Sequence, residues 1–364
     1  MTAAGSGLAA LRAQFPVCAR AAYLNAGTNG PLPAAAGTAA RAELDHELEA
    51  GRAGEPYFQR LLGLMEAVRA GYAARLGADP ADVALTTSTT DGVGRALLAL
   101  DLRPGDEVVT SDEEHPGLLG PLAALQARGV RVRVVPLAAV ADAVGPRTRA
   151  VACSHVSWRS GAVAPAALAE VDVPVLLDGA QGVGAVPVDV AALGADFYAG
   201  PGQKWLCGPG GLGMLYVSPA MRERCAPPAP GYLNLADPAA GLHARPHATA
   251  RAYDTPALGA APLAAARAAL AVLDGAGWDA IHAHATALAA RAAEALRARG
   301  REVLPRGATT LVTWREPDAP ARCAALAEAG VLVRFLPGED LLRASFGGWS
   351  DDADLDRLLA ALPR

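Results

Sequence analysis

The stretch GPGQKWLCGPGGLGMLYV, residues 200–217, contains the only lysine of the chain, Lys204. Lysine and arginine together number 32 among the 364 residues, so every other long basic side chain is arginine. Arginine cannot replace lysine in one role, because its guanidinium stays charged, whereas a desolvated amine can lose its proton and attack a carbonyl. A chance surface lysine is the alternative. We favour covalent chemistry with an aldehyde, because Lys204 follows a strand-like run in a glycine-rich loop.

The composition of the chain argues against several classes of partner and against a metal site. The chain is 52% hydrophobic with a formal net charge of −5, and its arginines are scattered, which argues against nucleic acid or an anionic membrane surface as the main partner. We expect a cytoplasmic protein, because the sequence has neither a signal-peptide pattern at its start nor an apolar run of membrane-spanning length. The five cysteines are widely spaced without a metal-binding pattern, so no metal site is expected.

Short apolar runs alternate with helix-like segments from about residue 60 onward. This alternation predicts an α/β fold whose main sheet is mostly parallel, with helices between its strands. Ligands of such sheets bind at the carboxyl ends of the strands, and polar residues follow the runs there. The sequence predicts seven strands, at residues 82–88, 106–112, 130–137, 149–157, 173–181, 195–200 and 211–218.

A loop rich in proline, glycine and histidine, residues 225–259, ends this alternation. Two long alanine-rich helices are expected after it, near 262–275 and 278–299, and then a small α+β unit. We therefore divide the chain into an N-terminal segment at 1–20, a large domain at 21–250 and a small C-terminal domain at 251–364.

Residues near the predicted strand ends suit pyridoxal 5'-phosphate (PLP). Asp178 ends an apolar strand and can keep a pyridinium nitrogen protonated, which makes the ring an electron sink. The TTSTTDG segment, residues 86–92, offers hydroxyls and a helix N-terminus to a phosphate, and His115 offers a flat ring. Taken singly, each has a plainer interpretation: a capping aspartate, an ordinary N-cap cluster and a solvated histidine.

Together these pieces resemble the class V aminotransferase family of fold type I PLP enzymes. That family includes cysteine desulfurases, isopenicillin-N-epimerase-like proteins and cystine or cysteine-conjugate C–S lyases. The resemblance implies the PLP-transferase fold. Its motifs run through the chain in the family's order as YLNAGTNGPLP, TTSTTDG, DEEHPG, SHVSWRSG, LLDGAQGVG, YAGPGQKWLCGPGGLGMLYV and LLRASFGGWSDDADLDRLL.

The resemblance also implies a role for each matching residue. Lys204 would form the Schiff base, and Asp178 would bond the pyridine nitrogen. The other cofactor contacts would be His115 stacked on the ring, Gln181 at the ring oxygen, Ser88, Thr89, Thr90 and Gln203 at the phosphate, and Thr255 from the second subunit of a homodimer with interface active sites. Arg343 would receive the substrate carboxylate, beside Asn25, Gly27 and Trp158.

Departures from the desulfurase pattern guide the choice of activity. Desulfurases carry serine and histidine just before the lysine, where this chain has Pro201 and Gln203, and they carry a cysteine shortly before the carboxylate-binding arginine. Residues 331–343 contain no cysteine. We therefore expect a C–S lyase that acts on cysteine, cystine or a cysteine S-conjugate by β-elimination, without an enzyme persulfide. An aminotransferase, an epimerase or a desulfurase on the same scaffold are the alternatives. The last alternative is a non-catalytic binding module, and the presence of the lysine argues against it.

Overall fold

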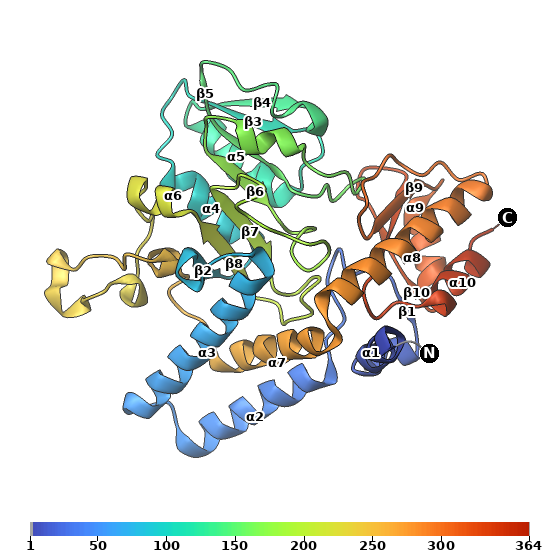
Figure 1. Ribbon diagram of the computed structural model, residues 1–364, viewed down its shortest axis with the longest axis horizontal. Coiled ribbons are helices and arrows are strands. Elements are labelled where there is room, and N and C mark those ends of the chain that lie inside the picture. Colours follow the sequence, from blue (N-terminus) through green and yellow to red (C-terminus); the bar gives the residue numbers. More distant parts are fainter. Residues whose placement is uncertain (1–2, 364) are drawn as a thin grey trace.

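The computed structural model describes residues 3–363. Its centre is a seven-stranded sheet with the order β2-β8-β7-β6-β5-β3-β4 (Figure 1). The strands are β2 (Val83–Thr86), β3 (Glu107–Ser111), β4 (Arg131–Val135), β5 (Thr148–Ser154), β6 (Val175–Asp178), β7 (Phe197–Pro201) and β8 (Gly213–Val217). Every predicted strand is present, and the prediction of a mainly parallel seven-stranded sheet is confirmed.

The direction of the strands decides where the site forms. Strands β3 to β7 pair in parallel, and β8 alone runs antiparallel to its two neighbours, β2 and β7. Strand β2 therefore points the same way as β7. The carboxyl ends of β2, β3, β6 and β7 meet at one edge of the sheet, and the loops that leave them lie close together.

Helices cover both faces of the sheet, because alternate residues of each strand point to opposite sides. Helices α4 (Thr89–Ala99) and α5 (Pro116–Ala127) cover one face, where their Leu97 and Leu122 belong to one buried apolar cluster with residues of β2 and β3. Helices α3 (Gly54–Leu76) and α7 (Ala260–Ala276) cover the other. Helix α2 (Ala34–Ala50) packs on α7, and the short α6 (Pro219–Arg224) follows β8.

The C-terminal unit has its own apolar core around Trp314 and Phe346, both fully buried. Its elements are β9 (Leu311–Arg315), β10 (Val331–Leu332), β11 (Arg334–Phe335), β12 (Leu341–Ser345), α8 (Trp278–Ala298), α9 (Ala319–Glu328) and α10 (Asp352–Ala361). Strand β12 lies between β11 and β9, antiparallel to both. The α+β character of this unit agrees with the prediction.

Contacts cross both of the predicted domain limits. Strand β1 (Ala22–Tyr23) pairs with β10, and Arg12 of α1 (Ala3–Ala13) donates to the Asp354 carboxylate at 2.6 Å, so the N-terminal part contacts the small unit. Helix α7 packs on α2 and α3 of the large unit. Alanine-rich helices carry no pattern that tells which core they cover. The division at residues 20 and 250 stays a prediction.

The long loop at 225–259 contains only short 3-10 turns, η5 (Tyr232–Asn234), η6 (Pro238–His243) and η7 (Ala250–Tyr253). It projects from the large unit as an arm, drawn in yellow at the left of Figure 1, and Tyr232 and Leu242 are exposed on it. Within residues 3–363, no helix combines the length and the apolar character needed to cross a membrane.

Candidate active site

The loops at the carboxyl edge of the sheet enclose a cavity of about 130 Å³. Each side chain reaches it from the end of a strand or the start of the helix that follows. Seven of the residues predicted for the cofactor line it: Ser88, Thr89, Thr90, His115, Asp178, Gln203 and Lys204. The structure thus brings together the lysine, the carboxylate and the hydroxyl cluster that the sequence singled out separately.

Lys204 lies just beyond β7 in a tight loop. Gly30 donates its backbone N–H to the carbonyl oxygen of Gln203, and a Cβ on Gly30 would lie only 2.0 Å from the carbonyl oxygen of Lys204. Glycine at position 30 is what allows the two segments to pack. Burial lowers the pKa of the Lys204 amine to about 8, an effect that Asp178 opposes and Arg343 and Arg334 strengthen. A substantial fraction of the amine is therefore neutral near pH 7.5.

Asp178 is the last residue of β6 and is 4% exposed. Burial raises the pKa of its carboxyl, while the backbone N–H of Ala180, which donates to Oδ1 at 2.9 Å, and the Lys204 amine lower it. The carboxylate has one oxygen fixed by the loop backbone. It lines the same cavity as Lys204, in position for a cationic ring nitrogen.

The cavity ends at the N-terminus of α4. Ser88 is the N-cap of this helix, and its Oγ accepts from the backbone N–H of Asp91 at 3.1 Å. Thr89 and Thr90 follow in the first turn. Gln203 also lines the cavity, and its Oε1 is buried without a hydrogen-bond partner among the described residues. Hydroxyls and free N–H groups at one helix start fit a phosphate, to which the Nε2 group of Gln203 can add a donor.

His115 is held as a neutral, oriented ring. It is the N-cap of α5, where its Nδ1 accepts from the backbone N–H of Gly117 at 3.0 Å. Burial lowers the pKa of its imidazole to about 4, and the nearby Lys204 charge adds to this effect. Its ring meets that of Trp158 edge-on with centroids 5.0 Å apart. A flat uncharged ring fixed on two sides suits stacking against an aromatic cofactor.

Two of the residues predicted for the cofactor lie outside the cavity lining. Gln181 bridges two loops, because its Nε2 donates to the carbonyl of Gly27 at 2.8 Å and its Oε1 accepts from the Trp205 indole at 3.1 Å. Thr255 lies along β2, where its backbone N–H donates to Leu85. The adjacent Asp254 makes a fully buried ion pair with Arg69 at 2.8 Å, which anchors the end of the 225–259 arm to the sheet.

Arg343 lies on β12 and is 1% exposed. Its Nη1 donates to the carbonyl oxygen of Trp158 at 2.6 Å, and its Nε has no partner among the described atoms. Burial, aided by Arg334, lowers the pKa of the guanidinium to about 9. A buried cation without an anion is costly, so this environment favours arrival of an anionic ligand. Asn25 accepts from Thr28 at 2.7 Å in the adjoining loop.

Arg334 was not predicted from the sequence as a site residue. It follows β10, and the antiparallel register of β11 and β12 places it directly opposite Arg343. Its Nη1 donates to the Thr28 hydroxyl at 3.2 Å. None of the ion pairs found in residues 3–363 includes either arginine. The arginine-rich composition hid this residue; only strand pairing distinguishes it.

The sequence assigned no role to the buried carboxyl of Glu114, which precedes His115. Glu114 accepts from the Ser111 hydroxyl, from the Ser154 backbone N–H at 2.9 Å and from the Ser154 hydroxyl at 2.6 Å. Burial raises the pKa of this carboxyl to about 7. Glu114 therefore ties the ends of β3 and β5 together beneath the loop that carries His115. The DEEHPG motif contained the signal, because an acidic residue directly precedes the histidine.

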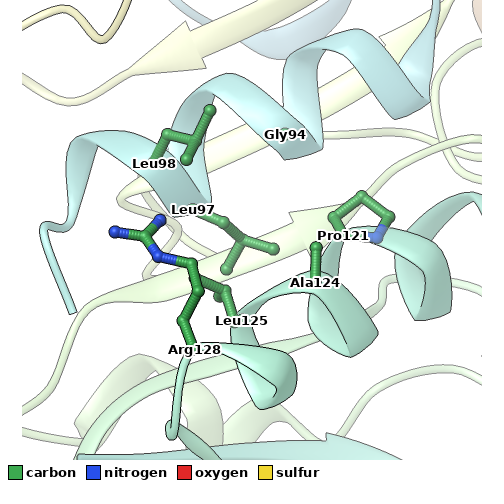
Figure 2. Close-up of a pocket in the computed structure, with 7 residues that line it drawn as sticks. All are labelled: Gly94, Leu97, Leu98, Pro121, Ala124, Leu125 and Arg128. Carbon is green, nitrogen blue, oxygen red and sulfur yellow. The ribbon is translucent and has the colours of Figure 1, made fainter. Parts of the chain in front are cut away.

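A different hollow, of about 210 Å³, lies between α4 and α5 (Figure 2). Its lining is apolar except for Arg128 and consists of Gly94, Leu97, Leu98, Pro121, Ala124, Leu125 and Arg128. It contains no nucleophile or acid–base pair and none of the predicted site residues. Among the described residues there is also no cluster of histidine, cysteine or acidic side chains able to hold a metal ion.

Known proteins with similar sequences include an epimerase and a desulfurase. The isopenicillin N epimerase of Streptomyces clavuligerus is 33% identical over 227 residues, covering 56% of this chain and 55% of the epimerase. The Escherichia coli cysteine desulfurase CsdA is 33% identical over 241 residues, covering 60% of this chain and 59% of the desulfurase. The matched regions thus span a little over half the length of these curated relatives.

Solved structures match over almost the whole chain. The cystine C–S lyase C-DES in complex with its product cysteine persulfide has a TM-score of 0.86 and 29% identity, covering 95% of this chain and 98% of C-DES. A C-DES mutant with glycine covalently linked to the PLP cofactor has a TM-score of 0.87. The predicted PLP-transferase fold type I is confirmed. The family model for class-V aminotransferases matches residues 23–358, and the chain belongs to the class V aminotransferase family.

Proposed function

We propose that this chain is a PLP-dependent C–S lyase that cleaves the Cβ–S bond of a cysteine derivative with two carboxylates, of which L-cystine is the simplest. One observation carries the proposal: Lys204, with a pKa lowered to about 8, shares a small cavity with Asp178. Two arginines that have no anionic partner lie next to this site: Arg343, which donates to Trp158, and Arg334, which donates to Thr28. The solved structure of the cystine C–S lyase C-DES with its product cysteine persulfide supports the same reaction class.

The cavity fits the cofactor on its own chemistry. Asp178 would hold the ring nitrogen, His115 would cover the ring, and the hydroxyls at the start of α4 with Gln203 would hold the phosphate. Gln203 Oε1 is buried without a hydrogen-bond partner in this structure. Either a protonated phosphate oxygen or an ordered water beside the phosphate would donate to it. When bound, PLP supplies the electron sink that accepts the charge left on the substrate α-carbon.

The chain itself supplies binding and proton transfer. Arg343 holds the α-carboxylate, which orients the α-carbon. Lys204 as a neutral amine takes the α-proton as general base, and Asp178 keeps its negative charge close to the ring nitrogen. The Cβ–S electrons leave with sulfur. For L-cystine and one water the products are cysteine persulfide, pyruvate and ammonia, which balances all atoms.

Arg334 is the residue that favours a substrate with two carboxylates. Two guanidinium groups on paired strands repel each other, and this repulsion contributes to the lowered pKa of Arg343. One bound carboxylate compensates one charge, and a second carboxylate on the leaving half of the substrate would compensate Arg334. A disulfide such as cystine has both groups, whereas cysteine has one.

A substrate panel tests the proposal. The cofactor-loaded protein is mixed with L-cystine, L-cysteine or S-methyl-L-cysteine, and pyruvate is measured. We expect L-cystine to give the highest kcat/KM. Arg334→Ala should lower kcat/KM about tenfold or more for cystine and little for S-methylcysteine. Pyruvate release without a preference for cystine would contradict the assignment of Arg334, and absence of pyruvate from every substrate would contradict the lyase.

An epimerase or an aminotransferase on the same scaffold is the second candidate, favoured by the relative named isopenicillin N epimerase. Both reactions begin with the same proton transfer to Lys204. They differ in outcome, because an epimerase exchanges the α-proton for solvent deuterium without releasing pyruvate, and an aminotransferase requires a keto acid. Either result in the panel would replace the lyase.

Covalent capture of PLP should depend on pH through Lys204. Only the neutral amine attacks the aldehyde, and its pKa is lowered to about 8 by burial. The rate of incorporation into apoprotein, trapped with borohydride, should rise with pH by roughly tenfold per unit below about 8 and level off above it. Butylamine, an unburied control amine, should show no such levelling until about pH 10. A protein curve that follows butylamine would contradict the lowered pKa.

Sulfur should leave without passing through an enzyme thiol. Cys207 is fully buried, burial raises the pKa of its thiol far above the ordinary value, and it is held in the left-handed region at φ 53°. Cys323 lies on α9 with its Sγ against the carbonyl of Val333 at 3.5 Å. Cys207→Ala and Cys323→Ala should each retain pyruvate release within about twofold. Loss of turnover with normal PLP content would replace the lyase with a persulfide-relay desulfurase.

We also propose that the protein is a homodimer in which Thr255 meets the partner's phosphate site. Thr255 is only 7% exposed and follows η7 near the end of the 225–259 loop. Sedimentation of the cofactor-loaded protein tests the dimer. PLP affinity of Thr255→Val tests the contact, and unchanged affinity would contradict it.

A further inference from the structure

Ser345 is a buried polar residue to which the reaction outlined above assigns no task. It is the last residue of β12 and is 0% exposed. Its backbone N–H donates to the carbonyl of Leu24 at 2.8 Å, so its backbone is paired. Its hydroxyl is not, because Oγ has no hydrogen-bond partner among the described atoms. A buried hydroxyl without a partner calls for an explanation.

Ser345 lies two residues after Arg343 on the same strand, so both side chains extend from the same face of β12. A Cβ built on Gly27 would lie 2.8 Å from Arg343 Nη2 and 2.8 Å from Ser345 Oγ. The guanidinium and the hydroxyl therefore both pack closely against Gly27, where no larger residue would fit, and this places the two polar groups near each other.

The hydrogen bonds of Arg343 show which edge of its guanidinium is free. Nη1 is taken by the Trp158 carbonyl at 2.6 Å, and Nε has no partner. The Nε–Nη2 edge remains, which is one of the two edges that can bind a carboxylate through parallel hydrogen bonds. Nη2 and Ser345 Oγ both pack against Gly27, so the hydroxyl lies near the Nη2 end of this edge.

We propose that Ser345 is a second substrate-binding residue, whose hydroxyl donates to the α-carboxylate that docks on the Nε–Nη2 edge of Arg343. The inference rests on the proposed function, because it requires an amino-acid substrate bound at Arg343. The carboxylate satisfies both buried groups at once. Ser345 thereby makes the site selective for α-amino acids over amines that lack the carboxylate.

The test compares two ligands of the cofactor-loaded protein that differ in the carboxylate alone, glycine and methylamine. Each is titrated while the visible absorbance of the cofactor is followed, so no turnover is needed. In Ser345→Ala the apparent Kd for glycine should rise about tenfold or more, and the apparent Kd for methylamine should stay within about twofold of wild type. Ser345→Thr, which keeps the hydroxyl, should restore part of the glycine affinity.

Thr110→Val is the matched control. The Thr110 hydroxyl is also fully buried without a partner, but Thr110 lies on β3 of the large sheet, whereas Arg343 and Ser345 share β12. Thr110→Val should leave both constants unchanged. Equal weakening of glycine and methylamine in Ser345→Ala, or unchanged glycine binding, would overturn this inference alone. A wild-type protein that takes up no PLP would overturn the proposed function together with it.

Discussion

Lys204→Arg is expected to abolish covalent attachment of PLP and to lower turnover by about 100- to 10,000-fold or more. The substitution keeps a long cationic side chain, so the charge in the cavity is largely preserved. It removes the one group that can form an imine and can act as a base near neutral pH, because a guanidinium does not lose its proton. The variant therefore loses the reactivity of the amine, while the charge and the length of the side chain are largely kept.

The arginine-rich composition makes this experiment unusually clean. Lys204 is the only lysine, so after borohydride treatment a pyridoxyl group on any lysine identifies one position by peptide mass. The control is a double variant, Lys204→Arg with Arg41→Lys, which restores one lysine on the exposed face of α2. It should remain inactive and unlabelled. Labelling or activity in the single variant would refute the central assignment.

Much of the fold could be predicted from the sequence, because its signals are local. Most strands of the large sheet, among them β2, β6 and β7, are short and buried on both faces, so each run identified a strand without knowledge of its neighbours. Lys204 and Asp178 were predictable for a related reason. Asp178 ends such a strand and Lys204 lies just beyond another, and a parallel sheet brings strand ends together at one edge whatever the details of its packing.

Features that depend on register or on packing could not be predicted. Arg334 faces Arg343 only because β11 and β12 pair in one particular register. Ser345 is notable only because its hydroxyl finds no partner in a fully packed core. The packing of α7 on α2 is a contact that alanine-rich periodicity does not encode. In each case the decisive information is a contact between segments far apart in the chain.

Arg343→Ala is expected to weaken substrate binding while leaving PLP in place. Loss of a charge-assisted bidentate pair should cost about 2–3 kcal/mol, which lowers kcat/KM by roughly 30- to 150-fold. The cofactor contacts lie on other elements, at the ends of β2, β3, β6 and β7, so its absorbance and its affinity should not change. Arg315→Ala is the matched control on the neighbouring strand β9, because Arg315 is exposed and pairs only with Glu302 at 3.0 Å.

The thermal stability of Arg343→Ala gives a second test of the role of Arg343. The folded state disfavours the charge of Arg343, since burial lowers the pKa of its guanidinium to about 9. A group whose pKa is lowered on folding makes the folded state less stable as pH falls below its unfolded pKa. Removing it should therefore offset part of the packing lost on truncation, and the Tm of the cofactor-loaded variant at pH 7 should stay within about 4 °C of wild type. A large fall in Tm together with loss of PLP would mean that Arg343 supports the fold instead of the substrate. Unchanged Tm with weakened binding would identify a cation that is held buried for an anion supplied by the substrate.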